Sequence, residues 1–193
     1  MSKLIVPGRS NLLIRNDIRL REIVQRETFL IEEREKVEER AKSVALTDTE
    51  KIQLKNWCEE LEELNKDYWR QERGLYILEA SGRESEGPFN RAYESYRSDP
   101  YWYLHPWLKS DCAGKGGCCG CGCGCCERDR SKTRVRCRGH CTAMCGCCQR
   151  TRGFEIKRGS EDYRRITYAS LSKNEQDTLS YCRNMMRGYF WGY

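Results

Sequence analysis

The chain has 193 residues, 33% of them charged, and a formal net charge of +6. Its hydrophobic content of 38% includes 14 cysteines. Without them roughly 59 residues remain apolar, which is little for a core built by burial alone, so a bound metal that fastens the fold is physically useful. We expect neither a secretory signal nor a membrane span, because charged residues and the Pro7-Gly8 pair interrupt the start and no stretch reaches roughly 18 apolar residues. The expected compartment is the reducing cytosol or nucleus, where cysteines remain thiols.

The first 80 residues predict a helical scaffold. Residues 1–16 are expected to be irregular, whereas residues 17 to about 46 contain no glycine or proline and have a helical composition. Apolar residues recur there every seven positions, at Ile23, Leu30, Val37 and Val44. This spacing is typical of a long amphipathic helix or a coiled coil, although Glu27 and Arg34 interrupt the companion positions.

A second helix is predicted to begin at the capping box Thr47-Asp-Thr-Glu50. Its apolar stripe has alternating steps of three and four, at Leu54, Trp57, Leu61, Leu64 and Tyr68. Gly74 is expected to end or weaken this helix. The two helices are expected to fold back as an antiparallel hairpin that serves as a scaffold, or as an arm for a protein partner or a second copy of the chain.

An aromatic segment follows the hairpin. Residues 80–88 read as a loop, residues 89–96 as a short amphipathic helix, and Asp99-Pro100 as the start of another helix whose length Pro106 limits. Its aromatic side chains are expected to be core rather than a platform for nucleic-acid bases.

Residues 110–153 form a cysteine module with short Cys-Cys and Cys-x-Cys steps separated by glycines. Such spacing suits thiolates on neighbouring or bridged ions, and soft thiolates with an imidazole favour Zn²⁺. The predicted ligands of about two to four Zn²⁺ ions are Cys112, Cys118, Cys119, Cys121, Cys123, Cys125, Cys126, Cys137, His140, Cys141, Cys145, Cys147 and Cys148. His105 is expected to be structural and Cys58 a buried free thiol. Iron–sulfur ligation, palmitoylation and disulfides are the alternatives to zinc.

Charge weighs against nucleic acid as the favoured partner. Ten basic residues face three acidic ones between residues 109 and 152. Three Zn²⁺ ions on twelve thiolates would carry about −6 and nearly cancel this excess.

The C-terminal part is expected to contain a short strand pair within residues 153–168, a last helix over residues 172–186 and a docked aromatic tail. The predicted fold class is therefore mainly α. The predicted units are the hairpin, residues 1–80, and residues 81–193, which hold the aromatic segment, the zinc module and the C-terminal helix.

The runs EGPFNRAYESYRSDPYWYLHPWLKSDC, GGCCGCGCGCC, GHCTAMCGCC and RGFE resemble a family of cysteine-rich hypothetical proteins of filamentous fungi, over roughly residues 68–154. The resemblance implies a shared metal-stapled fold and an intracellular setting, and it supplies no reaction. The pattern that it implies keeps eleven of the predicted ligands, whereas Cys121 and Cys137 are additions.

These observations favour a non-catalytic, zinc-dependent interaction or accessory module. An enzyme of fungal specialised metabolism, or one that uses an aminoacylated RNA, is the first alternative. Its candidate polar residues form no diagnostic constellation: Glu79, Glu86, Tyr93, Asp99, Tyr101 and His105. A metallothionein-like metal buffer and an RNA- or DNA-binding module are the others.

Overall fold

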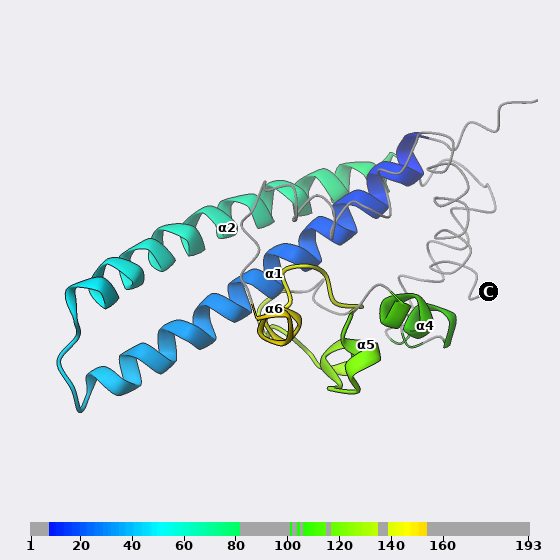
Figure 1. Ribbon diagram of the computed structural model, residues 1–193. Helices are drawn as coiled ribbons and strands as arrows, with labels where there is room; N and C mark the ends of the chain where they lie inside the picture. The colour runs from blue at the N-terminus through cyan, green and yellow to red at the C-terminus, as the bar shows by residue number, and fades with distance from the viewer. Residues whose placement is uncertain are drawn as a thin grey trace, which may run out of the picture.

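The computed structural model of the protein describes residues 8–81, 101, 104, 106–114, 117–134 and 139–153. Every regular element in these ranges is a helix, which confirms the predicted mainly α class (Figure 1). The elements are α1 (Gly8–Ala41), α2 (Asp48–Ala80), α4 (Pro106–Gly114), α5 (Cys118–Cys121), the 3-10 helix η2 (Cys125–Glu127) and α6 (Gly146–Arg152). A long hairpin is thus followed by a loop-rich cysteine module with short helices.

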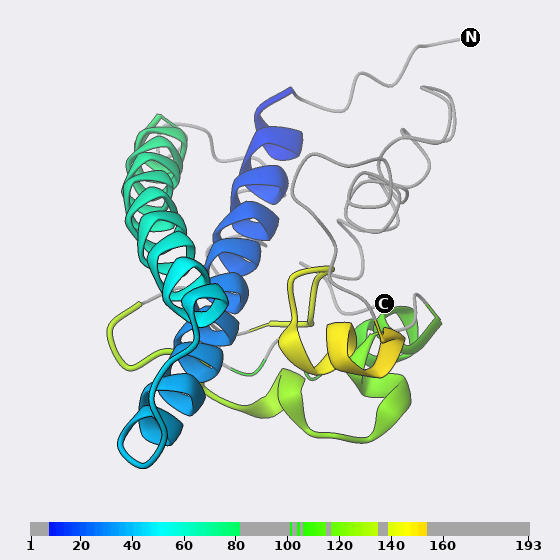
Figure 2. The same cartoon turned by 60° about the vertical axis from the view of Figure 1, so that its left-hand side comes forward.

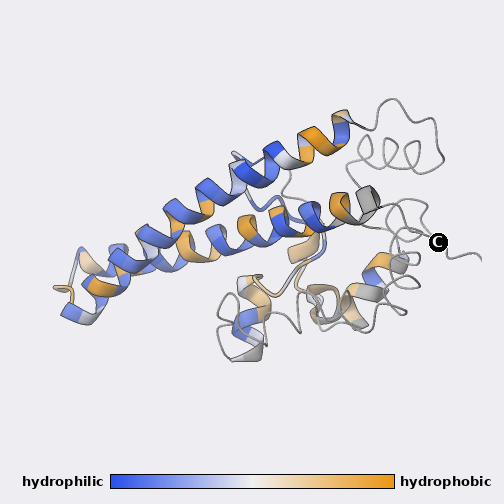
Figure 3. Ribbon diagram, turned by 90° about the horizontal axis from the view of Figure 1, so that it is seen from above, coloured by the Kyte–Doolittle hydropathy of each residue, from blue (hydrophilic) through white to orange (hydrophobic). Residues whose placement is uncertain are grey.

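The predicted antiparallel hairpin is present, and its two helices bury one shared core. That core consists of Leu13, Leu20, Ile23, Val24, Leu30, Leu64, Tyr68 and Leu75, with Phe29, Trp57, Leu61 and Leu78 at its edge. Ion pairs also join the helices at the border of this core: Arg19 contacts Asp67 at 2.6 Å, and Arg26 contacts Glu60 at 2.7 Å. Hydrophilic residues cover most of the remaining surface of the hairpin (Figure 3).

Helix α1 differs from its predicted bounds at both ends. It begins at Gly8 rather than after an irregular start, because Leu13 is 1% exposed and belongs to the hairpin core. It ends at Ala41, where the amide of Val44 donates to the carbonyl of Arg40 in the following turn. Val44 is 62% exposed, so the seven-residue repeat stops contributing to the core before its last predicted member.

Helix α2 begins where predicted, at the Thr47 cap. The Thr47 hydroxyl accepts from the amide of Glu50 at 3.3 Å, and the Glu50 carboxylate accepts from the amide of Thr47 at 2.9 Å. The expected end at Gly74 is wrong, because the helix continues to Ala80. Leu75 is fully buried in the core, so packing beyond Gly74 offsets the roughly 1 kcal/mol that glycine costs within a helix.

Helix α1 lies between α2 and the cysteine module (Figures 1 and 2). Its side away from the hairpin core carries polar side chains that are nevertheless buried, including Arg21, Gln25 and Glu27. A buried polar group is costly unless it is hydrogen-bonded, and the module supplies the partners of all three.

Several predicted elements lie outside the described residues: the helix over 89–96, the Asp99-Pro100 start, the strand pair within 153–168, the last helix over 172–186 and the aromatic tail. Pro106 begins α4, as suits a residue without an amide hydrogen at a first helical position. The division into units at residue 80 stays a prediction. None of the described helices has an apolar stretch of the length that a bilayer requires.

We predict that Gly74→Ala stabilises the protein by about 0.5–1 kcal/mol, because alanine loses less conformational entropy in a helix. An added Cβ meets only the side-chain nitrogen of Asn16, at 4.0 Å. Thermal unfolding followed by circular dichroism should show a midpoint about 1–4 °C higher. A lower midpoint would mean that the backbone at Gly74 is not regular helix.

Candidate metal centre

The cysteine module brings its predicted ligands into three groups whose ligand atoms lie within 4.8 Å of one another. The first group consists of Cys112, Cys119, Cys126 and His140. The second group consists of Cys118, Cys123, Cys125 and Cys147. The third group consists of Cys118, Cys141 and Cys148. Each group could hold a metal ion, and Cys118 belongs to two of them.

The adjacent cysteine pairs are divided between groups. Cys119 belongs to the first group while its neighbour Cys118 serves the other two. The pairs Cys125-Cys126, His140-Cys141 and Cys147-Cys148 are divided in the same way. Neighbouring side chains leave the backbone in different directions, so one pair can serve two sites. These four pairs therefore connect each group to both of the others.

Local backbone structure turns the ligands inward. Gly122 and Gly124 adopt left-handed φ values of 63° and 68°, which glycine reaches without steric cost. They lie on either side of Cys123 and reverse the chain between α5 and η2. Cys118 and Cys125, the first residues of those two helices, thereby meet in the second group.

Sulfur atoms also approach one another beyond the three groups. Cys145, 5% exposed at the N-terminal cap of α6, has its sulfur 3.5 Å from that of Cys118. The Cys112 and Cys141 sulfurs lie 3.7 Å apart, which joins the first group to the third. The Cys141 sulfur also accepts from the amide of Cys118 at 2.9 Å, a contact that stabilises a thiolate.

His140 is the one imidazole among these ligands, and it is 5% exposed. Its Nδ1 atom lies 3.3 Å from the Cys119 sulfur. Burial disfavours the charged ring, but hydrogen bonds to Cys112 and Cys126 outweigh it and raise the pKa of His140 to about 9. The raised pKa shows that the surrounding sulfurs stabilise positive charge at this position, where a bound metal ion would supply it.

The thiols shift one another's pKa in opposite directions. The pKa of Cys118 is raised chiefly by its hydrogen bond to Cys126, and that of Cys141 chiefly by its hydrogen bond to Cys112. The pKa of Cys126 is lowered chiefly by Cys112, and that of Cys145 chiefly by Cys118. The cluster cannot ionise fully by itself, because each thiolate opposes the next. Bound cations in place of the shared protons would remove this conflict.

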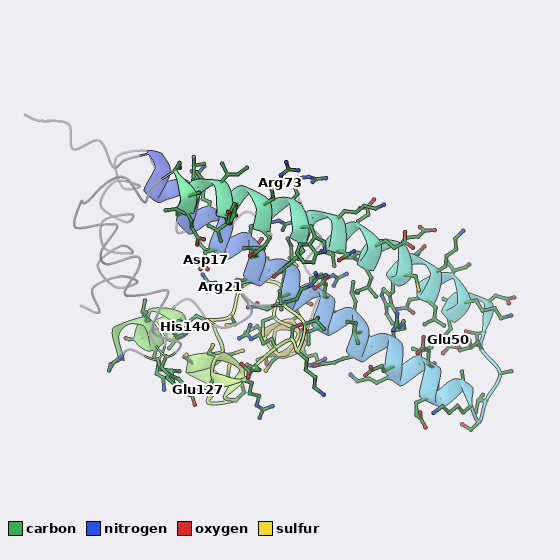
Figure 4. All side chains as sticks on the ribbon, turned by 180° about the vertical axis from the view of Figure 1, so that it is seen from behind. Asp17, Arg21, Glu50, Arg73, Glu127 and His140 are labelled. Carbon is green, nitrogen blue, oxygen red and sulfur yellow. The ribbon has the colours of Figure 1, made fainter. Side chains whose placement is uncertain are left out.

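Helix α1 holds the module through hydrogen bonds to its backbone. Arg21 donates to the carbonyl of His140 at 3.0 Å. Figure 4 shows Arg21 on α1 and His140 on the cysteine module that faces it. The Gln25 side-chain oxygen accepts from the amide and the hydroxyl of Thr142, each at 2.8 Å. The Thr28 hydroxyl donates to the carbonyl of Arg130 at 2.9 Å. The module is thus fastened to the hairpin beside the candidate ligand His140.

Ion pairs complete this attachment. Arg134 bonds Glu27 at 2.8 Å and stacks on Tyr68, with its guanidinium carbon 4.0 Å from the ring centroid. Arg150 contacts Glu32 and Glu33, each at 3.3 Å. These two arginines thus pair with carboxylates of α1, whereas the sequence had suggested that the module's basic residues mainly balance thiolate charge.

The remaining predicted site residues lie elsewhere. Cys121 is exposed and outside the three groups, and Cys137 and His105 lie outside the described residues. Cys58 is exposed on α2, not buried as predicted, because it lies off the apolar stripe. No disulfide joins the described cysteines, whose closest sulfurs, those of Cys118 and Cys148, are 3.1 Å apart.

The residues proposed for an enzyme form no site in the described part of the chain. Glu79 lies near the end of α2, and Tyr101 is 61% exposed. The other four are outside the described residues. Arg21 and Gln25, which hold the module, were not predicted from the sequence. The polar residue Glu27, which interrupts the heptad pattern, was the available indication that this side of the helix contacts polar groups.

Comparisons with protein-family models, with curated proteins and with solved structures gave no match.

We predict that Arg134→Met lowers the free energy of unfolding by about 2 kcal/mol, because it leaves the mostly buried Glu27 carboxylate without its partner. Urea unfolding followed by circular dichroism measures the change. Arg73→Met is the matched control, since Arg73 is exposed and points away from the hairpin (Figure 4). An equal effect of the two substitutions would contradict the role of Arg134.

We predict that Gly117→Ala disrupts the cluster, because an added Cβ lies 2.4 Å from the Cys112 sulfur and 2.8 Å from that of Cys141. The φ of Gly117 is −83°, so sulfur crowding and not backbone strain causes the effect. We expect the free energy of unfolding to fall by about 1–3 kcal/mol. The buried thiols should also react faster with a thiol reagent. Gly120→Ala is the control, since its Cβ meets Ala113 no closer than 3.4 Å. Unchanged thiol reactivity in Gly117→Ala would show that the sulfurs are not packed as described.

Proposed function

We propose that this is a zinc-binding protein in which a multinuclear cysteine and histidine site staples the fold of an interaction or accessory module. The observation that carries the proposal is that the first and second groups each have a full set of four protein ligands. Each offers four sulfur or imidazole ligands within 4.8 Å of one another, and structural zinc sites are filled by four such ligands.

The donor set supports zinc over magnesium and calcium. A Zn–S bond of about 2.3 Å in tetrahedral geometry places sulfurs about 3.8 Å apart. Within the first group the Cys112 and Cys126 sulfurs lie 3.9 Å apart, and within the third the Cys141 and Cys148 sulfurs lie 3.5 Å apart. Magnesium and calcium prefer oxygen ligands, and none of the three groups contains a carboxylate.

A structural role is favoured over a catalytic one. A catalytic zinc keeps one position open for water or substrate, whereas the first two groups already have four protein ligands each. The ligand His140 also accepts hydrogen bonds from α1 through its carbonyl. A metal that fixes His140 would therefore fix the attachment of the module to the hairpin.

We infer membership of the cysteine-rich fungal family, and an intracellular setting, from the motif resemblance. In support, the eleven ligands that the pattern keeps include all ten members of the three groups and Cys145 beside them. Cys121, an addition to the pattern, is exposed.

The partner that we propose is a protein or a second copy of the chain, reached through the hairpin. Nucleic acid is less favoured, because Lys109, Arg134 and Arg150 are each paired with a carboxylate. Analytical ultracentrifugation of the zinc-loaded protein tests self-association, and a monomer at micromolar concentration would leave only a heterologous partner.

The experiment that tests the proposal is elemental analysis of freshly purified protein together with native mass spectrometry. We expect three zinc ions per chain. Removal by a chelator should unfold the module cooperatively, because thiolates held this close repel one another without a cation between them. Protein isolated without a transition metal would overturn the proposal, and complete metal loss with unchanged structure would favour a metal buffer.

The double substitution Cys125→Ser, Cys126→Ser removes one ligand from the second group and one from the first. We expect it to reduce the zinc content and to make the module sensitive to protease. Cys121→Ser is the matched control because Cys121 lies outside the groups. Equal stability of the two variants would contradict a structural metal site.

A further inference from the structure

Cys118 occupies the centre of the cysteine cluster. It is 1% exposed, and it is the one residue shared by two of the three ligand groups in the described part of the chain. Its sulfur lies 3.1 Å from that of Cys148 and within 4.8 Å of those of Cys123, Cys125 and Cys147. One sulfur is therefore within reach of two metal positions.

Cys145 lies beside the third group, although it is not one of the three residues whose ligand atoms all lie within 4.8 Å of one another. Its sulfur is 3.5 Å from that of Cys118 and it is almost fully buried. The Cys141 and Cys148 sulfurs of the same group are also 3.5 Å apart. These separations are close to the edge of about 3.8 Å in a tetrahedral zinc site. Adding Cys145, through its contact with Cys118, would give the third group four sulfur ligands.

The number of ligands then requires sharing. Three tetrahedral ions offer twelve coordination positions, whereas the three groups with Cys145 contain eleven side chains. All twelve positions are filled if one thiolate binds two ions, and Cys118 is the side chain placed to do so. Two cations would also neutralise the most deeply buried of these thiolates, whose burial alone is unfavourable.

We propose that Cys118 is a bridging thiolate in a dinuclear zinc site, with Cys123, Cys125 and Cys147 on one ion and Cys141, Cys145 and Cys148 on the other. The first group holds a separate, mononuclear ion. This inference rests on the proposed function and assigns a specific coordination to it. Each thiol releases its proton to solvent as the ion binds, so no oxidant or reductant is involved.

The direct test is to replace zinc with ¹¹³Cd and to record its NMR spectrum on the full chain. We expect three cadmium resonances, two of which split each other through the shared sulfur. The third resonance, from the ion with an imidazole ligand, should be unsplit. Three unsplit resonances would overturn the bridge and leave the proposed metal binding intact. Protein that binds no metal would overturn the proposed function, and the bridge with it.

Substitutions assign the bridge. Cys118→Ser should abolish the splitting, and Cys119→Ser, its neighbour in the first group, should leave the split pair in place. Cys145→Ser should move one member of the split pair without affecting the unsplit resonance. Splitting that survives in Cys118→Ser would assign the bridge to another sulfur and overturn the proposal. Should Cys118→Ser fail to fold, the wild-type protein still decides the matter, because the β-protons of a bridging Cys118 must couple to both cadmium resonances of the split pair, and coupling to one alone would overturn the proposal.

Discussion

The structure of this protein depends on the crowding of sulfur atoms in its cysteine module. Ten thiols and one imidazole lie at mutual distances at which they cannot all ionise unless cations lie between them. The short helices of the module are too small to be stable alone, and the chain is poor in apolar residues once cysteine is set aside. In the module, contacts between sulfur atoms play the part that the apolar core plays in the hairpin.

The two halves of the described structure are joined through α1, which is buried on both sides. One side packs against the apolar stripe of α2, and the other presents Arg21, Gln25 and Glu27 to the module. The folded module supplies hydrogen-bond partners to all three. Disorder in the cysteine cluster would therefore remove these contacts from α1, which couples the stability of the hairpin to that of the module.

Much of this architecture could be predicted from the sequence, because its signals are local. The Thr47 capping box and the α2 stripe depend on residues a few positions apart, and the density of cysteines depends on no tertiary contact. The bounds of α1 could not be predicted in this way, because Leu13 extends the helix by packing against α2. The division of adjacent cysteines among groups, and the pairing of Arg134 with Glu27, depend on contacts between distant parts of the chain.

The division of adjacent ligands between groups restricts how this sequence can evolve. A single inserted residue within Cys147-Cys148 would redirect one of the side chains and deprive one group of a ligand. A substitution within any of the four pairs can likewise disturb a second group, because the adjacent residue in the chain belongs to that group. Changes of chain length are more readily tolerated at the exposed residues 132–133, between the attachment points Arg130 and Arg134. Descendants of this chain should therefore vary in length there and keep the spacing of their paired cysteines and His140.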